Sequence, residues 1–274
     1  MADAYSPGTF GDLLQQAFAA ATPEQRRAIN HVGLITAAAN GEPYVAGVLN
    51  ASPAQSAGLR RGDRLLALDG TPFDALHSFN PPSGNDSPPW NPLPRVLSFS
   101  RNGQQQDVSL APVFENLFDA CRSATLAGIQ QFSNGNKVIG YVHLWVLSRN
   151  WGDLATYQGI IHSLSHCDGM ILDLRHAYGA LADEHLEMFR PLREPGRSSY
   201  RYYDREIVLL QNESTAAGAT DFVASLSQLQ RVVSLGVTTA DGLPAEQTVD
   251  YPLTESVVSD PQFQAGMMTL MTIM

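Results

Sequence analysis

A short turn in the second half of the chain has the pattern of a nucleophile site. The apolar run EIVLL at 206–210 leads into QNESTAAG, and the helix-like run TDFVASLSQLQ follows. A strand, a tight turn and a helix, with small residues at the bend, is how many enzymes present a nucleophile. The bend here holds Ala216, Ala217 and Gly218. A catalytic elbow, an elbow without its nucleophile and an ordinary turn are therefore all open interpretations.

The other residue types that do chemistry show no metal or redox pattern. Among the seven histidines the best-spaced pair is His162 and His166, and we expect at least one of them to face solvent. Cys121 and Cys167 lie among apolar or helical residues without a C-x-x-C motif. Buried thiols are therefore favoured over a disulfide or a reactive thiol. The sequence predicts no metal and no cofactor.

Composition limits the classes of partner. The 274 residues carry a formal net charge of −10, and Lys137 is the only lysine. This balance argues against nucleic acid, which requires a basic patch. Hydrophobic residues at 44% suffice for one large domain or two ordinary ones. The chain has no run of about 18 apolar residues that would predict a membrane span, and its start makes a poor signal peptide.

The first part of the chain predicts a helical segment followed by a β module. Residues 1–30 have helical patterns, with Thr22 as the N-cap of a second helix. From 31 to 111, short apolar runs are broken by Gly, Asn and Asp turns, as in a small β domain, and Ser52 caps a short helix within it. The six prolines of 78–94 indicate an inserted surface loop, favoured over a functional lid.

The second part, 112–274, alternates helical and strand patterns. Helical runs such as VFENLFDACRSATL (113–126) alternate with buried apolar runs such as GMILDLR (169–175). Strands separated by helices imply a largely parallel sheet with helices on its faces. Ligands gather at the carboxyl ends of such strands, so the turns after GMILDLR and EIVLL form the candidate site.

The β module resembles the PDZ domain in its bacterial-protease form. The stretch YVAGVLNASPAQSAGLRRGDRLLALDGTPF carries the resemblance, with Gly-Asp and Asp-Gly turns flanking one strand. PDZ domains bind extended C-terminal peptides by strand addition. The resemblance implies that Gly33, Leu34 and Ile35 bind the peptide. A β module that only packs on its neighbour is the alternative.

The second part resembles the peptidase domain of carboxyl-terminal processing (tail-specific) proteases. NKVIGYVHLWVL, GMILDLRHAYGAL, SLGVTTADG and SDPQFQAGMMTL follow the order and spacing of that family's motifs, so the resemblance covers about residues 31–270. It implies an α/β fold: a crotonase/Clp-protease-like peptidase domain with a small β-rich PDZ-like domain inserted near the N-terminus. The expected domains are a helical segment 1–30, the PDZ-like domain 31–111 with its insertion 78–94, and the peptidase domain 112–274.

The resemblance also implies site residues. In that family a serine after the EIVLL-type strand attacks the peptide carbonyl, and backbone amides hold the oxyanion. The nucleophile position falls on Ala217, and the oxyanion donors fall on Gly179 and Gly218. A methyl group cannot attack a carbonyl. Three explanations stay open: an experimental Ser-to-Ala change, which is favoured, a natural pseudoprotease, and a shifted register with Ser214 or Thr215 as the nucleophile.

The general base is less defined than the nucleophile position. Many members of the family use a lysine after the helix, but VTTADGLPAEQ contains none, which excludes a Ser–Lys dyad. A branch resembling the tricorn-type enzymes uses a histidine and an acid. His176, in the turn beside the first oxyanion glycine, is the first candidate, followed by His31 and His143. Asp241 or Glu246 could orient the imidazole.

The resemblance implies a serine endopeptidase of the carboxyl-terminal processing type, here in an inactive Ser-to-Ala form at 217. Its partners would be protein or peptide substrates, captured through the PDZ-like domain by way of their C-termini. The alternative is a natural pseudoprotease that acts as a peptide-binding protein. A crotonase-like acyl-CoA enzyme would share only the α/β domain. Because bacterial members of the family work outside the cytoplasm, a periplasmic or secreted location is expected; the oligomeric state is open.

Overall fold

The structure is a computed structural model that describes residues 28–75, 77–80, 91–190, 202–255 and 259–274. The helices predicted before residue 28 and the middle of the proline-rich insertion lie outside these residues. The chain divides into two compact units, Met1–Ala127 with Pro252–Ser259, and Gly128–Tyr251 with Asp260–Met274. The first unit continues to Ala127, through the helix Leu117–Ala127. The domain boundary expected at 111 stays a prediction.

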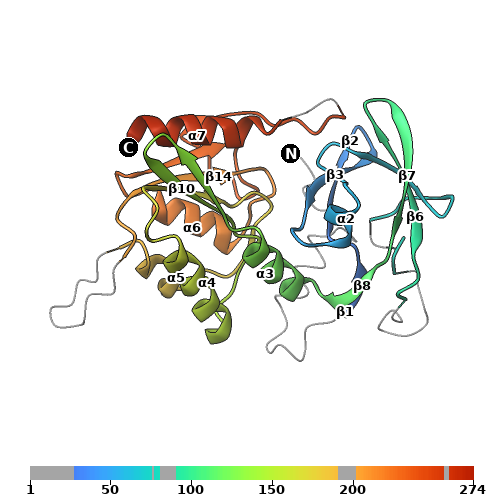
Figure 1. The fold of residues 1–274 in the computed structure, drawn as a ribbon, viewed down its shortest axis with the longest axis horizontal. Coiled ribbons are helices and arrows are strands. Elements are labelled where there is room, and N and C mark those ends of the chain that lie inside the picture. Colours follow the sequence, from blue (N-terminus) through green and yellow to red (C-terminus); the bar gives the residue numbers. More distant parts are fainter. Residues whose placement is uncertain (1–27, 76, 81–90, 191–201, 256–258) are drawn as a thin grey trace. The chain divides into compact units, whose positions relative to one another are not determined.

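The first unit is a small β module (Figure 1). Its elements are β1 (Ala28–His31), β2 (Leu34–Ala39), β3 (Glu42–Val48), α2 (Pro53–Ser56), β4 (Arg64–Leu68), β5 (Thr71–Pro72), β6 (Arg95–Arg101), β7 (Gln104–Leu110), β8 (Val113–Asn116) and α3 (Leu117–Ala127). The main sheet has the antiparallel order β2-β3-β4-β6-β7, which leaves β2 at an edge among the described strands. Its core includes Val45, Leu65 and Leu97, and each buried aliphatic side chain stabilises the fold by about 1.5–3 kcal/mol.

The short helix predicted after residue 52 is confirmed. Ser52 is the N-cap of α2, its hydroxyl accepts from the N–H of Gln55 at 3.2 Å, and Pro53 occupies the first turn. The local sequence is sufficient to specify this turn, because the cap and the proline act within four residues.

Two helical predictions are wrong, because the residues concerned form a pair of antiparallel strands instead. Residues 28–30 belong to strand β1, and 113–116 form β8, so α3 begins only at Leu117. The two strands pair antiparallel, with Ala28 opposite Asn116 and His31 opposite Val113. This pairing joins segments more than 80 residues apart, and such contacts override local helix propensity.

Residues 252–255 belong to the first unit, although in the chain they follow Tyr251 of the second. The Glu255 carboxylate accepts from the N–H of Gly103 at 2.7 Å, the hydroxyl of Ser100 at 2.8 Å and Nε of Arg64 at 3.0 Å. The bond from Gly103, with help from Ser100 and Arg64, lowers the pKa of Glu255. This acceptor set explains why the segment groups with residues far earlier in the sequence.

The second unit is an α/β domain. Its elements are β9 (Gln130–Asn134), β10 (Lys137–His143), β11 (Val146–Leu147), α4 (Trp151–Ser163), β12 (Gly169–Asp173), β13 (Tyr178–Gly179), α5 (Asp183–Glu187), β14 (Glu206–Gln211), α6 (Gly218–Leu226), β15 (Val232–Gly236), β16 (Gln247–Thr248) and α7 (Pro261–Ile273). The sheet order is β16-β15-β14-β12-β10-β9, parallel from β16 to β10 and antiparallel at β9. The predicted largely parallel sheet is confirmed, and β11 and β13 form a separate parallel pair.

Helices cover both faces of this sheet (Figure 1). On one face Ile171, Val208 and Leu210 pack with Leu270 of α7. On the other face, Leu172 and alternate residues of the neighbouring strands pack with the side of the unit that carries α4, α5 and α6. Strand side chains alternate between faces, so one buried strand serves both cores. Within the described residues no helix is long and apolar enough to cross a membrane.

Candidate active site

The turn between β14 and α6 holds a strained residue. Ala217 has φ 54° and ψ −132°, a backbone conformation that residues with a side chain rarely adopt. Such a conformation costs about 1–3 kcal/mol and persists where the surrounding structure enforces it, often at functional sites. The strain falls on the residue expected to carry the nucleophile, at a strand–turn–helix corner like those that expose a catalytic serine.

Two neighbouring loops hold this elbow in place. The N–H of Ala216 donates to the carbonyl of Ala177 at 3.0 Å, which ties the elbow to the turn after β12. The N–H of Ala240 donates to the carbonyl of Thr215 at 3.0 Å, which ties the loop after β15 to the elbow. The carboxyl ends of three adjacent parallel strands therefore converge on Ala217, as expected for a site in a parallel sheet.

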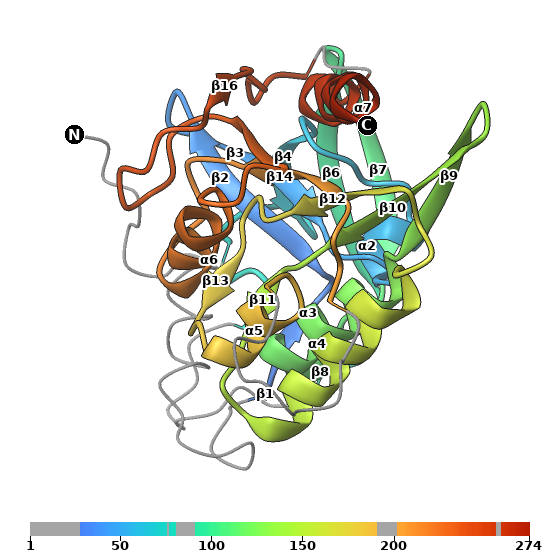
Figure 2. The ribbon, with the colours of Figure 1, turned by 90° about the vertical axis from the view of Figure 1, so that its left-hand side faces the viewer.

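The two expected oxyanion glycines are neighbours in space. A Cβ atom on Gly218 would lie 2.3 Å from the N atom of Leu181 and 2.6 Å from the carbonyl oxygen of Gly179. Figure 2 shows α6, which begins at Gly218, beside β13, which carries Gly179. Only a glycine permits this approach, because all the obstructing atoms are backbone.

The backbone arrangement at the two glycines suits them as donors. Tyr178 donates to the carbonyl of Trp145, just before β11, and Ala180 donates to that of Leu147 on β11. The N–H between them, that of Gly179, therefore points to the other side of the strand. Gly218 is the first residue of α6, and the first N–H groups of a helix have no partner inside the helix. Both glycines can therefore direct an N–H toward a ligand.

In the described hydrogen bonds, Asp241 contacts the elbow and not the imidazole of a histidine. Its Oδ2 accepts from the N–H of Ala217 at 2.7 Å and from the hydroxyl of Thr220 at 2.8 Å. A carboxylate at a helix N-terminus is stabilised by the helix dipole, and Asp241 takes this position for α6. Burial and the nearby Asp241 together raise the pKa of the Tyr178 phenol. The sequence predicted a carboxylate here as a partner of the base; its contact with position 217 itself was not foreseen.

His176 is held by Asn212, a residue that sequence reasoning missed. The Asn212 side chain accepts from the backbone N–H of His176 at 2.9 Å, and its Nδ2 lies 3.0 Å from Nε2 of the imidazole. His176 also has a positive φ of 59°. The first candidate base therefore sits in a turn bound to the elbow, half-buried and fixed at both backbone and ring.

Gln211, beside Asn212, anchors the loop that carries Asp241. Its Nε2 donates to the carbonyls of Val237 at 2.8 Å and Leu243 at 3.0 Å. Consecutive strand residues point to opposite sides, so Gln211 and Asn212 reach opposite loops. The signal available in the sequence was two amide side chains directly after the apolar run of β14.

The shifted-register explanation for the nucleophile loses its support. Thr215 is fully buried, and its hydroxyl donates to the carbonyl of Leu174 at 2.8 Å. Ser214 lies in the turn that Asn212 caps, with its N–H directed to Asn212 Oδ1 at 3.2 Å. Neither residue has the strained elbow conformation that Ala217 shows. Position 217 stays the predicted nucleophile position.

The third histidine candidate belongs to a buried polar network. His143 Nε2 lies 2.8 Å from the carbonyl oxygen of Arg175, and its ring stacks on Trp145 at 3.5 Å. Burial lowers the pKa of His143 despite the nearby Asp173 carboxylate. Burial alone would raise the pKa of Asp173, but Arg175 and His143 hold it well below its usual range. Arg175 links this network to helix α7, because one of its guanidinium nitrogens lies 2.8 Å from Oδ2 of Asp260, the N-cap of that helix.

The remaining base and acid candidates lie in other surroundings. His31 is in the first unit, where burial lowers its pKa to about 4, with Glu115 at 3.5 Å. Glu246 donates its backbone N–H to Ser234 Oγ at 3.0 Å, and burial raises the pKa of its carboxyl. Lys137, the only lysine, stands 3.8 Å from Asp168 at the start of β10.

The expected buried thiols are confirmed, and His166 is exposed as expected for one of the two histidines. His166 faces solvent and lies 3.1 Å from Oε1 of Gln131. Across the described ranges, no three His, Cys, Asp or Glu side chains cluster as metal ligands. Both Cys121 and Cys167 are free and buried, which confirms buried thiols over a disulfide, and burial raises the pKa of each thiol.

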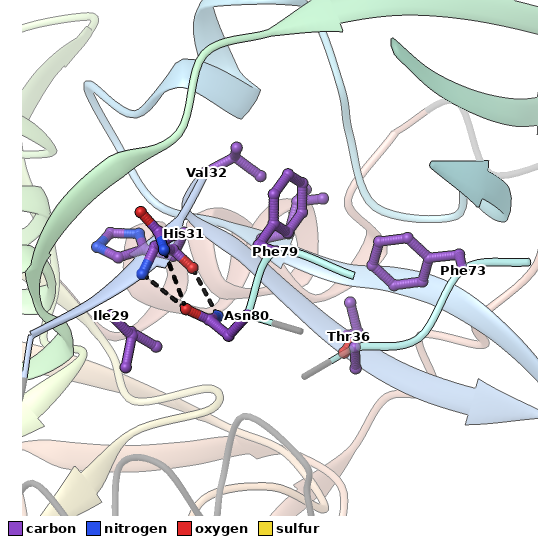
Figure 3. A pocket seen from close by; sticks show the side chains of 10 residues that line it. Ile29, His31, Val32, Thr36, Phe73, Phe79 and Asn80 are labelled. Atoms are coloured by element: carbon purple, nitrogen blue, oxygen red, sulfur yellow. Dashed lines mark hydrogen bonds between the residues drawn. The ribbon is translucent and has the colours of Figure 1, made fainter. Parts of the chain in front are cut away.

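The residues expected to bind a peptide lie where β2 begins. Gly33, with φ 79°, fits against Ser52, and Leu34 and Ile35 start the edge strand. Leu34 and Thr36 line a small pocket together with Phe73 and Phe79. Figure 3 shows Phe79 between Val32 and Phe73, whereas the ring of His31 points away from both phenylalanines.

Comparisons with known proteins agree with the expected family. A carboxyl-terminal-processing protease from Synechocystis sp. is 26% identical over 221 residues, which cover 69% of this chain and 46% of the relative. This chain thus spans about half the length of the curated relative that it matches. No protein-family model matches it.

One of the solved structures that resemble this chain supports the same fold. A putative S41 protease from Bacteroides fragilis has a TM-score of 0.50 and 14% identity, with 78% of this chain and 65% of that chain covered. A photosystem II D1 C-terminal processing protease has a TM-score of 0.48 and 18% identity, with 77% and 61% covered. The resemblance to the carboxyl-terminal processing proteases and the α/β peptidase fold are confirmed.

Proposed function

We propose that this chain, a relative of the carboxyl-terminal processing serine proteases, captures protein substrates as extended peptides and presents them to a serine-peptidase site. The nucleophile position of that site is Ala217. With alanine there, the chain binds peptide and does not cleave it; peptide-bond hydrolysis belongs to the A217S form.

The strained backbone of Ala217 carries this proposal. At φ 54° and ψ −132° it occupies a nucleophile-elbow conformation, although its methyl group gains nothing from the strain. An ordinary strand-to-helix turn would relax to an extended cap residue, as α2 and α4 do at Ser52 and Asn150. A conformation maintained at this cost fits a site built for a hydroxyl that projects toward substrate.

Stabilisation of the oxyanion would come from the two glycines beside the elbow. A serine hydroxyl at 217 would attack the peptide carbonyl beside Gly179 and Gly218. Their N–H groups would stabilise the negative charge that develops on the carbonyl oxygen. One such donor contributes about 2.7–4 kcal/mol of barrier lowering in serine proteases.

The proton acceptor would come from Asp241 or His176. Asp241 contacts the elbow directly, with Oδ2 at 2.7 Å from the N atom of Ala217. His176 lies in the turn whose next residue, Ala177, accepts from the elbow at 3.0 Å. General bases act within hydrogen-bond reach of the proton that they remove, so both positions are compatible with the role.

Peptide capture would occur at the edge strand β2. Strand addition needs an unpaired strand edge for backbone hydrogen bonds and a pocket for a side chain. Among the described strands β2 lies at an edge, and the apolar side chains of Leu34, Phe73 and Phe79 line the pocket beside it. An apolar side chain of the substrate fits this lining. A periplasmic or secreted place of work is part of the same proposal and depends on the family resemblance.

The test compares A217S with A224S, a matched control because Ala224 is half-buried on the same helix but away from the elbow. Each protein is incubated with a reduced, unfolded polypeptide and the products are separated by mass spectrometry. We expect fragments from A217S alone. Peptide binding by the unchanged chain, measured by fluorescence anisotropy with a C-terminal peptide, should be present.

The second candidate is a natural pseudoprotease, favoured by one observation. The carboxylate of Asp241 ties down the N–H of Ala217, and none of the site residues is a lysine. If A217S binds peptide and leaves the polypeptide intact, the peptidase proposal is wrong and the binding protein remains. Loss of both binding and cleavage would contradict both candidates.

A further inference from the structure

The side chain of Asn212 joins the two turns of the candidate site. Asn212 is 3% exposed and directly follows β14. Its Oδ1 accepts from the backbone N–H of His176 at 2.9 Å and of Ser214 at 3.2 Å, and the hydroxyl of Thr215 lies 3.3 Å away. One amide thus contacts both the elbow turn and the turn that carries the histidine.

These contacts fix which end of the amide is oxygen. Two backbone N–H groups, from His176 and Ser214, converge on the same atom of Asn212. A nitrogen in that position would face two donors with its own hydrogens, leaving the backbone N–H groups of His176 and Ser214 without this acceptor. An unsatisfied buried donor costs about 1–3 kcal/mol, so the oxygen must occupy this position.

The orientation of the amide determines the proton on the imidazole. With Oδ1 facing the backbone, Nδ2 faces Nε2 of His176 at 3.0 Å. Nδ2 can only donate, so Nε2 must accept with its lone pair. A neutral imidazole carries one proton, which then resides on Nδ1, and the partner of one ring nitrogen sets the tautomer of the other.

We propose that Asn212 is a positioning residue that holds His176 as a neutral imidazole with its proton on Nδ1. In this tautomer the ring presents Nδ1–H as a hydrogen-bond donor, and the lone pair of Nε2 is committed to Asn212. Because its accepting nitrogen is occupied, His176 is not the general base of the site in this tautomer.

This inference deepens the proposed function, on which the choice of proton acceptor rests. It also selects between the two proton acceptors: with Nε2 engaged by Asn212, Asp241 is the remaining acceptor. The tautomer itself can be measured in the unchanged chain, which needs no serine at 217. A failure of peptidase activity in A217S would therefore leave the tautomer result intact, and the reverse also holds.

The test is heteronuclear NMR of the folded chain with isotope-labelled histidine, above the pH at which imidazoles protonate. The two ring nitrogens differ strongly in chemical shift according to which one bears hydrogen. We expect His176 to show a protonated Nδ1 and an unprotonated Nε2. H176Q, which removes the His176 signals, supplies the assignment. A proton on Nε2 would overturn the proposal.

The variant N212D makes the test sharper. An aspartate keeps an oxygen for the two backbone N–H groups but replaces the Nδ2 donor by an acceptor, so the proton on the ring should move to Nε2. N150D is the matched control, since Asn150 caps α4 and contacts no histidine in the described bonds. An unchanged tautomer in a folded N212D, or a changed one in N150D, would contradict Asn212 as the determinant.

Discussion

Two helices of the second unit begin beside an aspartate, and their starts are built differently. Helix α7 follows Asp260, whose backbone is extended and whose carboxylate accepts the N–H of Phe263 at 2.9 Å. Helix α6 follows Ala217, which has a strained backbone and no side-chain cap. Its carboxylate comes from Asp241, 24 residues later, on another loop.

Under the proposed function, the difference separates a structural helix start from a functional one. At α7 the cap, the following proline and the partner Arg175 all lower the free energy of the fold. At α6 the chain accepts strain and a missing cap, and it uses a distant loop to stabilise the helix start. A site that must expose one residue toward substrate gives up local stability at that residue.

The largest expected effect lies on the α7 side. R175M should lower the free energy of unfolding by about 3–5 kcal/mol, because it leaves the fully buried Asp173 carboxylate without its cation. Urea denaturation measures the change. R205M is the control: Arg205 pairs with Asp204 at 3.5 Å while more than half exposed, so its loss should stay within about 0.5 kcal/mol.

On the α6 side the largest effect should come from G218A. Its Cβ would lie 2.3 Å from the Leu181 N atom, so backbone must move, and overpacking of this kind costs about 1–3 kcal/mol. G159A is the opposite case, because nothing lies within 4 Å of a Cβ there and Gly159 is inside α4. It should stabilise by about 0.5–1 kcal/mol. Equal effects of the two changes would argue against the close approach at Gly218.

Removal of the remote carboxylate should have a moderate effect. D241A takes away the acceptor for the Ala217 N–H and the Thr220 hydroxyl, and loss of such a cap costs about 0.5–2 kcal/mol. D241N retains an acceptor oxygen and should recover most of that stability. Thermal and urea unfolding of both variants test this. If D241A and D241N are equally stable, Asp241 does not cap α6.

The smallest expected effect, that of A217G, is an increase in the free energy of unfolding. A217G relieves a strain of about 1–3 kcal/mol while adding about 0.5–1 kcal/mol of unfolded-chain entropy. We therefore expect a small gain in stability. A224G, inside α6, should lose about 1 kcal/mol relative to alanine, as glycine does in helices. A clear loss of stability in A217G would contradict the strained conformation.

The sequence predicts much of this molecule because many of its features are local. The cap at Ser52 and the alternation that produces the parallel sheet act over a few residues or one element. The strands at 28–31 and 113–116 were missed because they exist only through each other. Pairing between distant segments leaves little trace in a single sequence.

The site divides in the same way. Ala217, Gly179 and Gly218 could be predicted because a strand and small residues at the turn mark them, and the family resemblance assigns their roles. The contacts of Asp241 with Ala217 and of Asn212 with His176 could not be predicted, since each joins loops from different strands. Their positions depend on strand order, which the pattern of apolar residues does not give.

The central claim is that position 217 is a nucleophile elbow. The most direct measurement is the intact mass and peptide map of A217S and A224S after incubation with a fluorophosphonate probe. We predict one covalent adduct on A217S, located at position 217, and none on A224S. A folded A217S that binds peptide and stays unlabelled, or that is labelled elsewhere, would contradict the claim.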